Sequence, residues 1–316
     1  MKKYISAAIR DILEEPVQVR MDEVKNPRTS LSTLLQIAKY DTNIDVLYEL
    51  AYNSKTPAEV RYYLADNSLQ GVREMVASLS FTEPEVLSKL SRDPSDYVCK
   101  TVARNPNTPD EDTIWLIAQE NVNIIDAVLR RPEISDEVLL AILNTDLVTA
   151  GGSIGLGICR EIIKAIKWML EIDGTVPDDR VLIELARVHD WDVESELIMS
   201  DIDGEWKLPT EVFYILAESP NKSTLRDLGE DPNTPLDILL RLADHPTASI
   251  RRGVAHSTKL PEECYHKLSL DDDDIVRSWI ARNPAVPEEI VESLLDDPNE
   301  RVRLGAEKRL NGRGEL

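Results

Sequence analysis

The chain has 316 residues, of which 42% are hydrophobic and only 5% are aromatic. Its 36 Lys and Arg residues are outnumbered by 58 Asp and Glu residues, which gives a formal net charge of −22 at pH 7. The apolar fraction is that of a folded protein rather than a disordered acidic tail, and the negative charge repels phosphate backbones and anionic lipids. Composition therefore disfavours a general nucleic-acid-binding protein.

No membrane-spanning or export segment is recognisable in the sequence. No stretch approaches the roughly 18 consecutive apolar residues that a membrane span needs. Near the start, Arg10 and Asp11 interrupt the region where a signal peptide has its hydrophobic centre. The three cysteines, Cys99, Cys159 and Cys264, are far apart and lack metal-ligand spacing, which is typical of reduced thiols in a protein core. We expect a soluble, cytoplasmic protein with no membrane partner.

The N-terminal part of the chain is expected to be helical. Residues 4–15 form an amphipathic segment that Pro16 interrupts, so residues 1–25 are predicted to be an N-terminal helical cap. Residues 26–52 resemble a weak copy of the repeat described next, and we assign 26–143 to an N-terminal repeat array.

The sequence repeats with a period of 26, which is visible in three columns. The acidic column comprises Glu59, Glu85, Glu111, Glu137, Glu211, Asp237, Glu263 and Glu289. Two apolar columns comprise Leu64, Leu90, Leu116, Ile142, Leu216, Leu242, Leu268 and Leu294, and Val72, Val98, Ile124, Ile250, Val276 and Val302. A fixed period of this length indicates a repeat architecture.

The copy at 231–257 indicates how one unit folds. Thr234 is predicted to be an N-cap, Pro235 to occupy the first turn, and Asp237 to stand at the third helical position. A carboxylate near the positive end of a helix dipole stabilises the helix by about 0.3–1 kcal/mol. The acidic column is therefore interpreted as a set of helix starts rather than as catalytic acids. A second, shorter helix of one or two turns is predicted around 250–255.

One such unit cannot bury its own apolar side chains. Within 235–243 the apolar residues recur at i, i+1, i+4 and i+5, which places them in one stripe along a helix. Stacking of successive units would bury this stripe, whereas no long alternation of apolar and polar residues supports strands. The prediction is an all-α fold: an α-solenoid of about ten two-helix repeats, with α-helix followed by short α- or 3₁₀-helix. The period is too short for HEAT, armadillo or TPR units.

The residues of the repeat also form a recognisable motif. The pattern Asn-Pro-x-x-Pro-x-x-Ile/Val-x-x-x-Leu, followed by Asp-Pro-x-x-x-Val-Arg-x-x-Val-Ala, is seen at 281–306 and in part at 91–109. It resembles the leucine-rich repeat variant family, and the resemblance covers most of 53–143 and 205–308.

This resemblance implies a fold rather than a reaction. It implies a right-handed superhelix of alternating α- and 3₁₀-helices without a β-sheet, distantly like HEAT proteins. One type of this family carries a cysteine-bound iron–sulfur cluster ahead of its repeats. The present chain has no cysteine before Cys99, so that feature is absent.

The middle of the array, 144–204, departs from the period. The interval between positions 137 and 211 is 22 residues longer than two repeats. Within it, residues 173–186 resemble one degenerate unit. The extra length is therefore expected mainly in 144–172, which contains a glycine-rich run before an apolar helix. Because no strand precedes this run and no Lys-Ser/Thr pair follows it, we interpret it as a joint or an added helix rather than a phosphate cradle. Residues 205–316 are assigned to the C-terminal array and cap.

Residues 187–206 contain side chains that a divalent ion prefers. They are His189, Asp190, Asp192, Asp201, Asp203 and Glu205. The calcium-loop pattern is incomplete, because Met199 and Thr210 stand where its end ligands should be. The four histidines also lack the i, i+4 pairing of a zinc site. We therefore predict no metal and no other cofactor.

An acidic run is one candidate for binding a partner. It comprises Asp271, Asp272, Asp273 and Asp274 and replaces the usual Asp-Pro turn of the repeat. Such a run is either a solvated loop or an anionic ridge for a basic partner. Trp279, shortly after it, is a candidate aromatic anchor.

A column of arginines is the other candidate. It comprises Arg251, Arg277 and Arg303. Helices pack about 8–10 Å apart, so these residues would form a stripe that could follow an acidic peptide or a phosphate chain. Alternatively, they pair with aspartates of adjacent turns such as Asp244, Asp271 and Asp297, tying one repeat to the next. We favour the second interpretation.

The leading functional prediction is a non-enzymatic scaffold that binds another protein along an extended curved surface. No nucleophile, base and orienting group occur at an interpretable spacing. One alternative is an acidic polyanion mimic that inhibits a nucleic-acid-binding protein, which the charge of −22 supports. A second alternative, a HEAT-like DNA-binding or DNA-repair protein, is disfavoured by the same charge.

Overall fold

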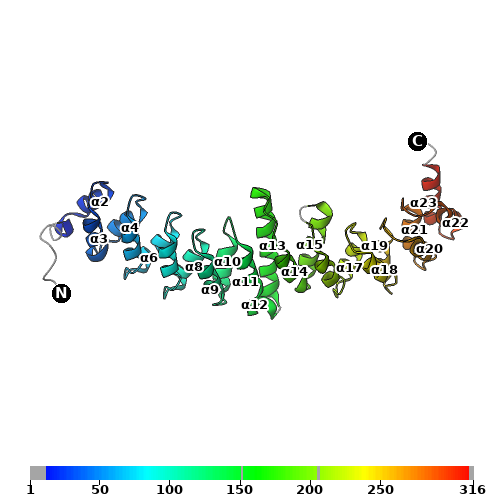
Figure 1. The fold of residues 1–316 in the computed structure, drawn as a ribbon, viewed down its shortest axis with the longest axis horizontal. Helices are drawn as coiled ribbons and strands as arrows, with labels where there is room; N and C mark the ends of the chain where they lie inside the picture. The colour runs from blue at the N-terminus through cyan, green and yellow to red at the C-terminus, as the bar shows by residue number, and fades with distance from the viewer. Residues whose placement is uncertain (1–11, 151, 205–206, 313–316) are drawn as a thin grey trace. The chain divides into compact units, whose positions relative to one another are not determined.

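The computed structural model describes residues 12–150, 152–204 and 207–312, except for the side chains of 173, 202 and 203. Within these residues the chain is all-helical and has no β-strand (Figure 1). It divides into two compact units, which we call unit 1 (Met1–Leu147) and unit 2 (Val148–Leu316). The boundary falls inside the predicted central segment, 144–204. Part of the predicted N-terminal cap, residues 1–11, lies outside the described residues.

Unit 1 consists of helix pairs. Its helices are α2 (Val17–Lys25), α3 (Leu31–Tyr40), α4 (Ile44–Tyr52), α5 (Ala58–Leu64), α6 (Gln70–Ser78), α7 (Pro84–Leu90), α8 (Asp96–Arg104), α9 (Asp110–Ile117), α10 (Val122–Leu129) and α11 (Asp136–Leu143), with α12 (Asp146–Thr149) at the boundary. The first helices of the pairs, α5, α7, α9 and α11, begin at 58, 84, 110 and 136, so they recur with a constant step of 26. The second helices α6, α8 and α10 keep the same step.

Unit 2 begins with a long helix and continues with the same pairs. Its helices are α13 (Ser153–Asp173), α14 (Asp179–Arg187), α15 (Trp191–Asp203), α16 (Thr210–Leu216), α17 (Lys222–Glu230), α18 (Leu236–Ala243), α19 (Ala248–Val254), α20 (Glu262–Ser269), α21 (Asp274–Arg282), α22 (Glu288–Ser293), the 3₁₀ helix η1 (Leu294–Asp296) and α23 (Glu300–Asn311). First helices α16, α18, α20 and α22 begin at 210, 236, 262 and 288. The step is therefore the same as in unit 1.

In both units, the main contacts join each helix to the next one or two along the chain. In unit 1, α4, α6, α8 and α10 contact one another in that order, and in unit 2 the same holds for α15, α17, α19, α21 and α23. Both predicted apolar columns lie in the core, where none of their side chains is more than 4% exposed. Each pair therefore buries its apolar stripe against its neighbours, as the all-helical solenoid prediction requires.

The helix starts differ by one residue from the prediction. Pro235, with an extended ψ of 142°, is the N-cap of α18, so Thr234 lies outside the helix and Asp237 is its second residue. At the same position of the repeat, Thr82 and Thr108 close the preceding helix by donating their hydroxyl groups to the carbonyls of Val76 (2.5 Å) and Val102 (2.6 Å). The buried hydroxyl of Thr234 has no such partner among the described residues. The acidic column remains in the first turns of the first helices, as predicted.

The second helices are more regular than the resemblance implies. α6, α8, α17 and α21 are α-helices of nine residues, and α19 has seven. Within the described ranges, the only 3₁₀ helix is η1, which follows a first helix. A regular alternation of α- and 3₁₀-helices is therefore not observed.

The insertion forms a helix rather than a loop. Its extra residues make α12 and the 21-residue α13, which packs against α15. Gly155 and Gly157 lie inside α13, and Gly174 ends it in a left-handed conformation (φ 76°) that a residue without Cβ adopts readily. No helix among the described residues combines the length and apolar character needed to cross a bilayer.

Candidate partner-binding surface

The arginine column is engaged inside unit 2. Nε of Arg251 lies 2.6 Å from Oδ2 of Asp271, and Nε of Arg277 lies 2.7 Å from Oδ2 of Asp297. Each arginine also donates from Nη1 to a backbone carbonyl of the turn before its own helix, to His245 (2.9 Å) and to Asp271 (2.7 Å), respectively. Each guanidinium thus fastens its own turn to the following repeat. This is the ladder that we favoured from the sequence, although Asp244 pairs with Lys267 and not with an arginine.

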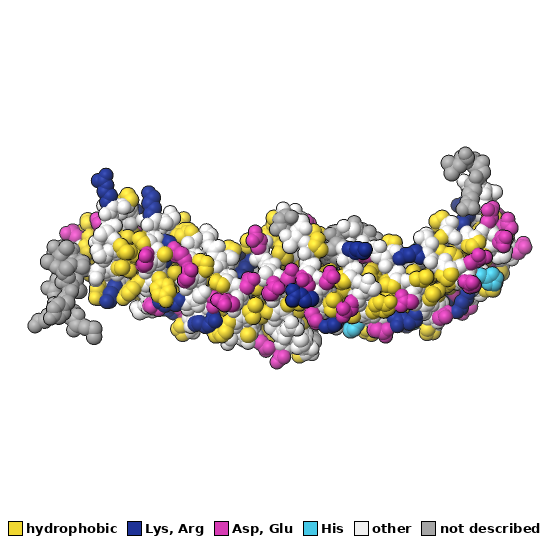
Figure 2. All heavy atoms as spheres, in the orientation of Figure 1, with side chains coloured by type: hydrophobic (Ala, Val, Ile, Leu, Met, Phe, Trp, Pro, Cys, Tyr) yellow, Lys and Arg dark blue, Asp and Glu magenta, His cyan; other side chains and the backbone are white. Residues whose placement is uncertain are grey.

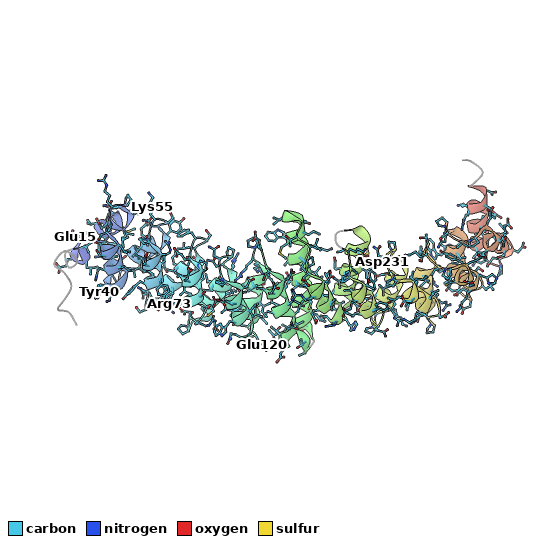
Figure 3. All side chains as sticks on the ribbon, in the orientation of Figure 1. Glu15, Tyr40, Lys55, Arg73, Glu120 and Asp231 are labelled. Atoms are coloured by element: carbon cyan, nitrogen blue, oxygen red, sulfur yellow. The ribbon has the colours of Figure 1, made fainter. Side chains whose placement is uncertain are left out.

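The same clamp occurs in unit 1. Arg73, labelled in Figure 3, pairs with Asp93 at 2.6 Å and donates from Nη1 to the carbonyl of Asn67 (2.9 Å). In α8 this position holds Cys99, whose thiol lies 3.3 Å from the carbonyl of Asp93. Arg303 in unit 2 donates from Nη1 to a carbonyl of its preceding turn. The arginine position is therefore structural in both units.

The electrostatics of the clamp agree with this role. The side chains of Arg251 and Arg277 are only 12% and 14% exposed. Hydrogen bonding from Arg277 holds the pKa of Asp297 below its ordinary value. A partner would have to compete with these partly buried ion pairs to reach either arginine.

The acidic run is likewise used within the molecule. Asp273 caps α21 by accepting from the backbone N–H groups of Ile275 (3.1 Å) and Val276 (3.0 Å). The contacts of all four carboxylates are Asp271 with Arg251, Asp272 with Arg251, Asp273 with Arg252, and Asp274 with Asn299. The run therefore forms a cross-linked turn, and of its residues only Asp272 is largely exposed.

Trp279 remains accessible at the surface of α21. Its side chain is 36% exposed and its ring centroid lies 3.9 Å from that of His256, with the planes inclined by 47°. The guanidinium carbon of Arg282 lies 5.9 Å from the same ring. Trp279 thus forms a surface with His256 and Arg282, which were not among the site residues predicted from the sequence.

Two cations on this surface were not predicted as site residues. Arg282 on α21 and Lys308 on α23 are exposed, and neither has an ion-pair partner among the described residues. They line a groove of about 400 Å³ between the two helices, which we call the C-terminal groove. Its lining residues are Arg282, Pro284, Gly305, Lys308, Arg309 and Gly312.

Gly305 shapes the C-terminal groove. A Cβ atom at this position would lie 3.2 Å from Cγ and Nε of Arg282, so glycine allows the arginine to lie close against α23. Arg309 donates to the carbonyls of Pro284 (3.0 Å) and Val286 (2.6 Å), and this ties α23 to the turn after α21. The groove therefore has one cation engaged by the backbone and two exposed cations without an ion-pair partner among the described residues.

Unit 1 has a related surface between α6 and α8. The two most exposed aromatic side chains of its second helices are Tyr97 (70%) and Tyr52 (66%). Lys100 and Arg104, on α8 with Tyr97, have no ion-pair partner in the described part of the chain, and both line a groove of about 580 Å³. Aromatic and cationic side chains thus recur together on second helices.

The first helices present a different surface. Several of their cations pair with a carboxylate of the preceding repeat, as in Lys89 with Asp66 and Arg241 with Glu218. The Nζ atom of Lys89 also lies 4.0 Å from the ring centroid of Tyr62. Charges of both signs are intermixed on the visible face of each unit (Figure 2). An exposed cation beside an aromatic residue also occurs on the first helix α3, where Nζ of Lys39 lies 5.1 Å from the ring centroid of Tyr40. The second helices differ in that their exposed cations line grooves between successive second helices.

The described residues form neither a metal site nor a reactive thiol site. Among the described residues, no group of three His, Cys, Asp or Glu side chains could hold a metal ion, and the 201–205 run extends beyond those residues. His189 instead contacts the buried carboxylate of Glu194 (3.2 Å), which also accepts from Thr224 (2.6 Å). Burial raises the pKa of Cys159 to about 12, so this thiol stays protonated near neutral pH.

A scan against protein-family models finds no family that matches this sequence, and a search of curated proteins finds no match either.

Proposed function

We propose that the protein is a non-enzymatic scaffold that binds another protein through the second helices of its repeats. The observation that carries this proposal is that each unit has a groove between second helices that is lined by exposed cations. Several first-helix cations are engaged by neighbouring repeats, whereas Lys100, Arg104, Arg282 and Lys308 on second helices have no ion-pair partner among the described residues. Exposed aromatic side chains beside cations are typical of binding hot spots.

We also propose that the helix pairs are about ten repeats of the leucine-rich repeat variant type, wound into a superhelix. The constant step of 26 between corresponding helices and the succession of neighbour contacts support this. A continuous row of second helices would present the kind of surface that solenoids use for binding.

The test is affinity capture from the native source with two charge-reversal variants. Wild type is compared with a second-helix variant (Lys100→Glu, Arg104→Glu, Arg282→Glu, Lys308→Glu) and with a first-helix variant (Lys89→Glu, Arg241→Glu, Lys267→Glu) of similar charge change. We expect one protein to be retained by wild type and by the first-helix variant and to be lost from the second-helix variant. Equal retention by both variants would contradict the proposed surface.

A polyanion mimic is the second candidate, because carboxylates are displayed on first-helix turns. Glu59, Glu85 and Glu111 are exposed and follow one another at the step of the repeat. If this function holds, a Glu→Gln triple variant at these positions loses the captured protein, and duplex DNA displaces that protein from wild type. Binding of a duplex by the chain itself at physiological salt would instead support the DNA-binding alternative.

A further inference from the structure

We propose that the C-terminal groove binds a short acidic peptide segment, with Arg282 and Lys308 pairing with its carboxylates and Trp279 contacting its apolar atoms. This inference rests on the proposed scaffold function and names the chemistry of the partner at one place on it.

The first argument is the charge state of the groove. On α19 and α21, Arg251, Arg252 and Arg277 all pair with aspartates. Arg282 and Lys308 stand in the last turns of α21 and α23 and have no such partner in the described ranges. The partial negative charge of a helix C-terminus amounts to about half an elementary charge, which leaves about half of the charge of each cation uncompensated. A carboxylate is the group that both cations would bind most strongly.

The second argument is shape. Because Gly305 has no side chain, the guanidinium of Arg282 lies beside α23 and reaches the same groove as Lys308. The ring of Trp279 on α21 lies next to Arg282 and packs against the tilted ring of His256, which follows α19. A peptide can place one or two carboxylates on the cations and its side-chain or backbone atoms on these rings.

The third argument favours a peptide over a nucleic acid. Two exposed cations in a groove of about 400 Å³ match one or two carboxylates, not the continuous charge of a duplex. The net charge of −22 repels any long polyanion. A short segment interacts mainly with the nearest charges, because dissolved ions screen interactions over more than about 8–10 Å.

The inference can be tested with the full chain and a synthetic probe. Fluorescence anisotropy is measured with fluorescein-labelled hexaglutamate and with hexaglutamine as the uncharged match. We expect saturable binding of hexaglutamate only. The variant Arg282→Ala/Lys308→Ala should weaken it at least tenfold, whereas Lys222→Ala/Arg301→Ala, which removes the same charge from exposed positions outside the groove, should change it less than twofold. Trp279→Phe should remove most of the change in tryptophan emission on binding.

Three results would overturn the inference. They are no binding of hexaglutamate by wild type, equal weakening by the two double variants, and tighter binding of a 20-base-pair duplex than of the peptide. Thermal unfolding followed by circular dichroism checks that the variants remain folded, and the comparison of two peptides on wild type does not depend on any variant. If a protein is captured in the way proposed above but hexaglutamate does not bind, the scaffold proposal is supported and the acidic-peptide site is refuted. The reverse outcome would leave the peptide site and remove the scaffold proposal.

Discussion

At the end of several second helices, one side chain donates a hydrogen bond to the backbone of the preceding repeat. Asn105 and Asn283 donate their amide groups to backbone carbonyls there, both at 2.8 Å, to Ala77 and Ala255 respectively. Asp231, labelled in Figure 3, has the same position after α17 and lies near Asp201. Burial, with a further contribution from Asp201, raises the pKa of Asp231 to about 6. When Asp231 is ionised, the contact between its repeat and the preceding one is therefore weaker than the contacts made by Asn105 and Asn283.

Asp231→Asn should therefore stabilise the protein at neutral pH. The folded state binds the proton of Asp231 more tightly than the unfolded state, so the contribution of this residue to stability falls as pH rises from about 4 to about 6. Asparagine removes this loss, and its amide can donate to Asp201. We expect a gain of about 1–3 kcal/mol at pH 7 and little difference below pH 4. Urea unfolding of the variant and of wild type, from below pH 4 to pH 7, measures the difference in unfolding free energy at each pH.

Asn283→Asp is the matched control for that experiment. It should lower stability at pH 7, because an ionised carboxylate cannot donate to the carbonyl of Ala255. A less stable Asp231→Asn protein at pH 7 would contradict the role assigned to this joint.

The arginine clamp makes a second prediction at this scale. Arg277→Ala should destabilise the protein by about 2–4 kcal/mol, because it leaves the buried carboxylate of Asp297 without its partner. A double-mutant cycle with Asp297→Ala should give a coupling of at least about 1 kcal/mol. The exposed Arg301→Ala serves as control, with an expected change within about 0.5 kcal/mol. A coupling indistinguishable from zero would show that the ladder does not hold the repeats together.

Among the helices, α17 and α19 approach each other at two glycines. A Cβ atom on Gly253 would lie 2.2 Å from the carbonyl oxygen of Arg226, and one on Gly229 would lie 2.6 Å from the backbone nitrogen of Val254. Backbone atoms block both places, so neither contact can be relieved by a change of rotamer. The two helices would have to separate to admit a side chain.

Gly253→Ala should therefore lower the free energy of unfolding by about 2–3 kcal/mol, the cost of overpacking a tight contact. Gly157→Ala is its control, since a Cβ atom there meets nothing within 4 Å inside α13. That substitution should instead stabilise the protein by about 0.5–1 kcal/mol through helix propensity. Thermal unfolding of the two variants should show shifts of opposite sign, and shifts of equal sign would contradict the close packing of α17 and α19.

Helix positions and pairing were partly predictable because they depend on local patterns. The period places both apolar columns in the core, and the recurrence of arginine and aspartate predicts the clamp. The cap could not be assigned correctly, because Thr234 and Pro235 are adjacent and both favour a helix start. The start of α13 was obscured by glycines, which are typical of loops but are tolerated in a helix that packs on a neighbour.

The binding surface was less predictable than the fold. Whether a surface arginine is paired depends on which carboxylates approach it in space, so Arg251 and Arg282 look alike in sequence but differ in the structure. One signal was available, since His256, Arg282 and Lys308 occupy one column of the repeat and all three can carry positive charge. The resemblance to a repeat family concerns the fold and gave no guide to this column.

At the scale of the whole molecule, stability depends on contacts between neighbours. Within each unit the main contacts join a helix to the next one or two along the chain. In such an arrangement, the stability of a repeat is its own contribution plus those of its interfaces with adjacent repeats. A local defect should consequently spread to neighbouring helices and fade with distance along the chain.

Hydrogen exchange of the Gly253→Ala protein, compared with wild type and read by mass spectrometry, tests this stacking most directly. We predict faster exchange in α17 and α19, a smaller increase in α15 and α21, and no change in α4, α6 and α8 of unit 1. An equal increase in both units, or one confined to α19, would contradict the account of repeats stabilised by their immediate neighbours.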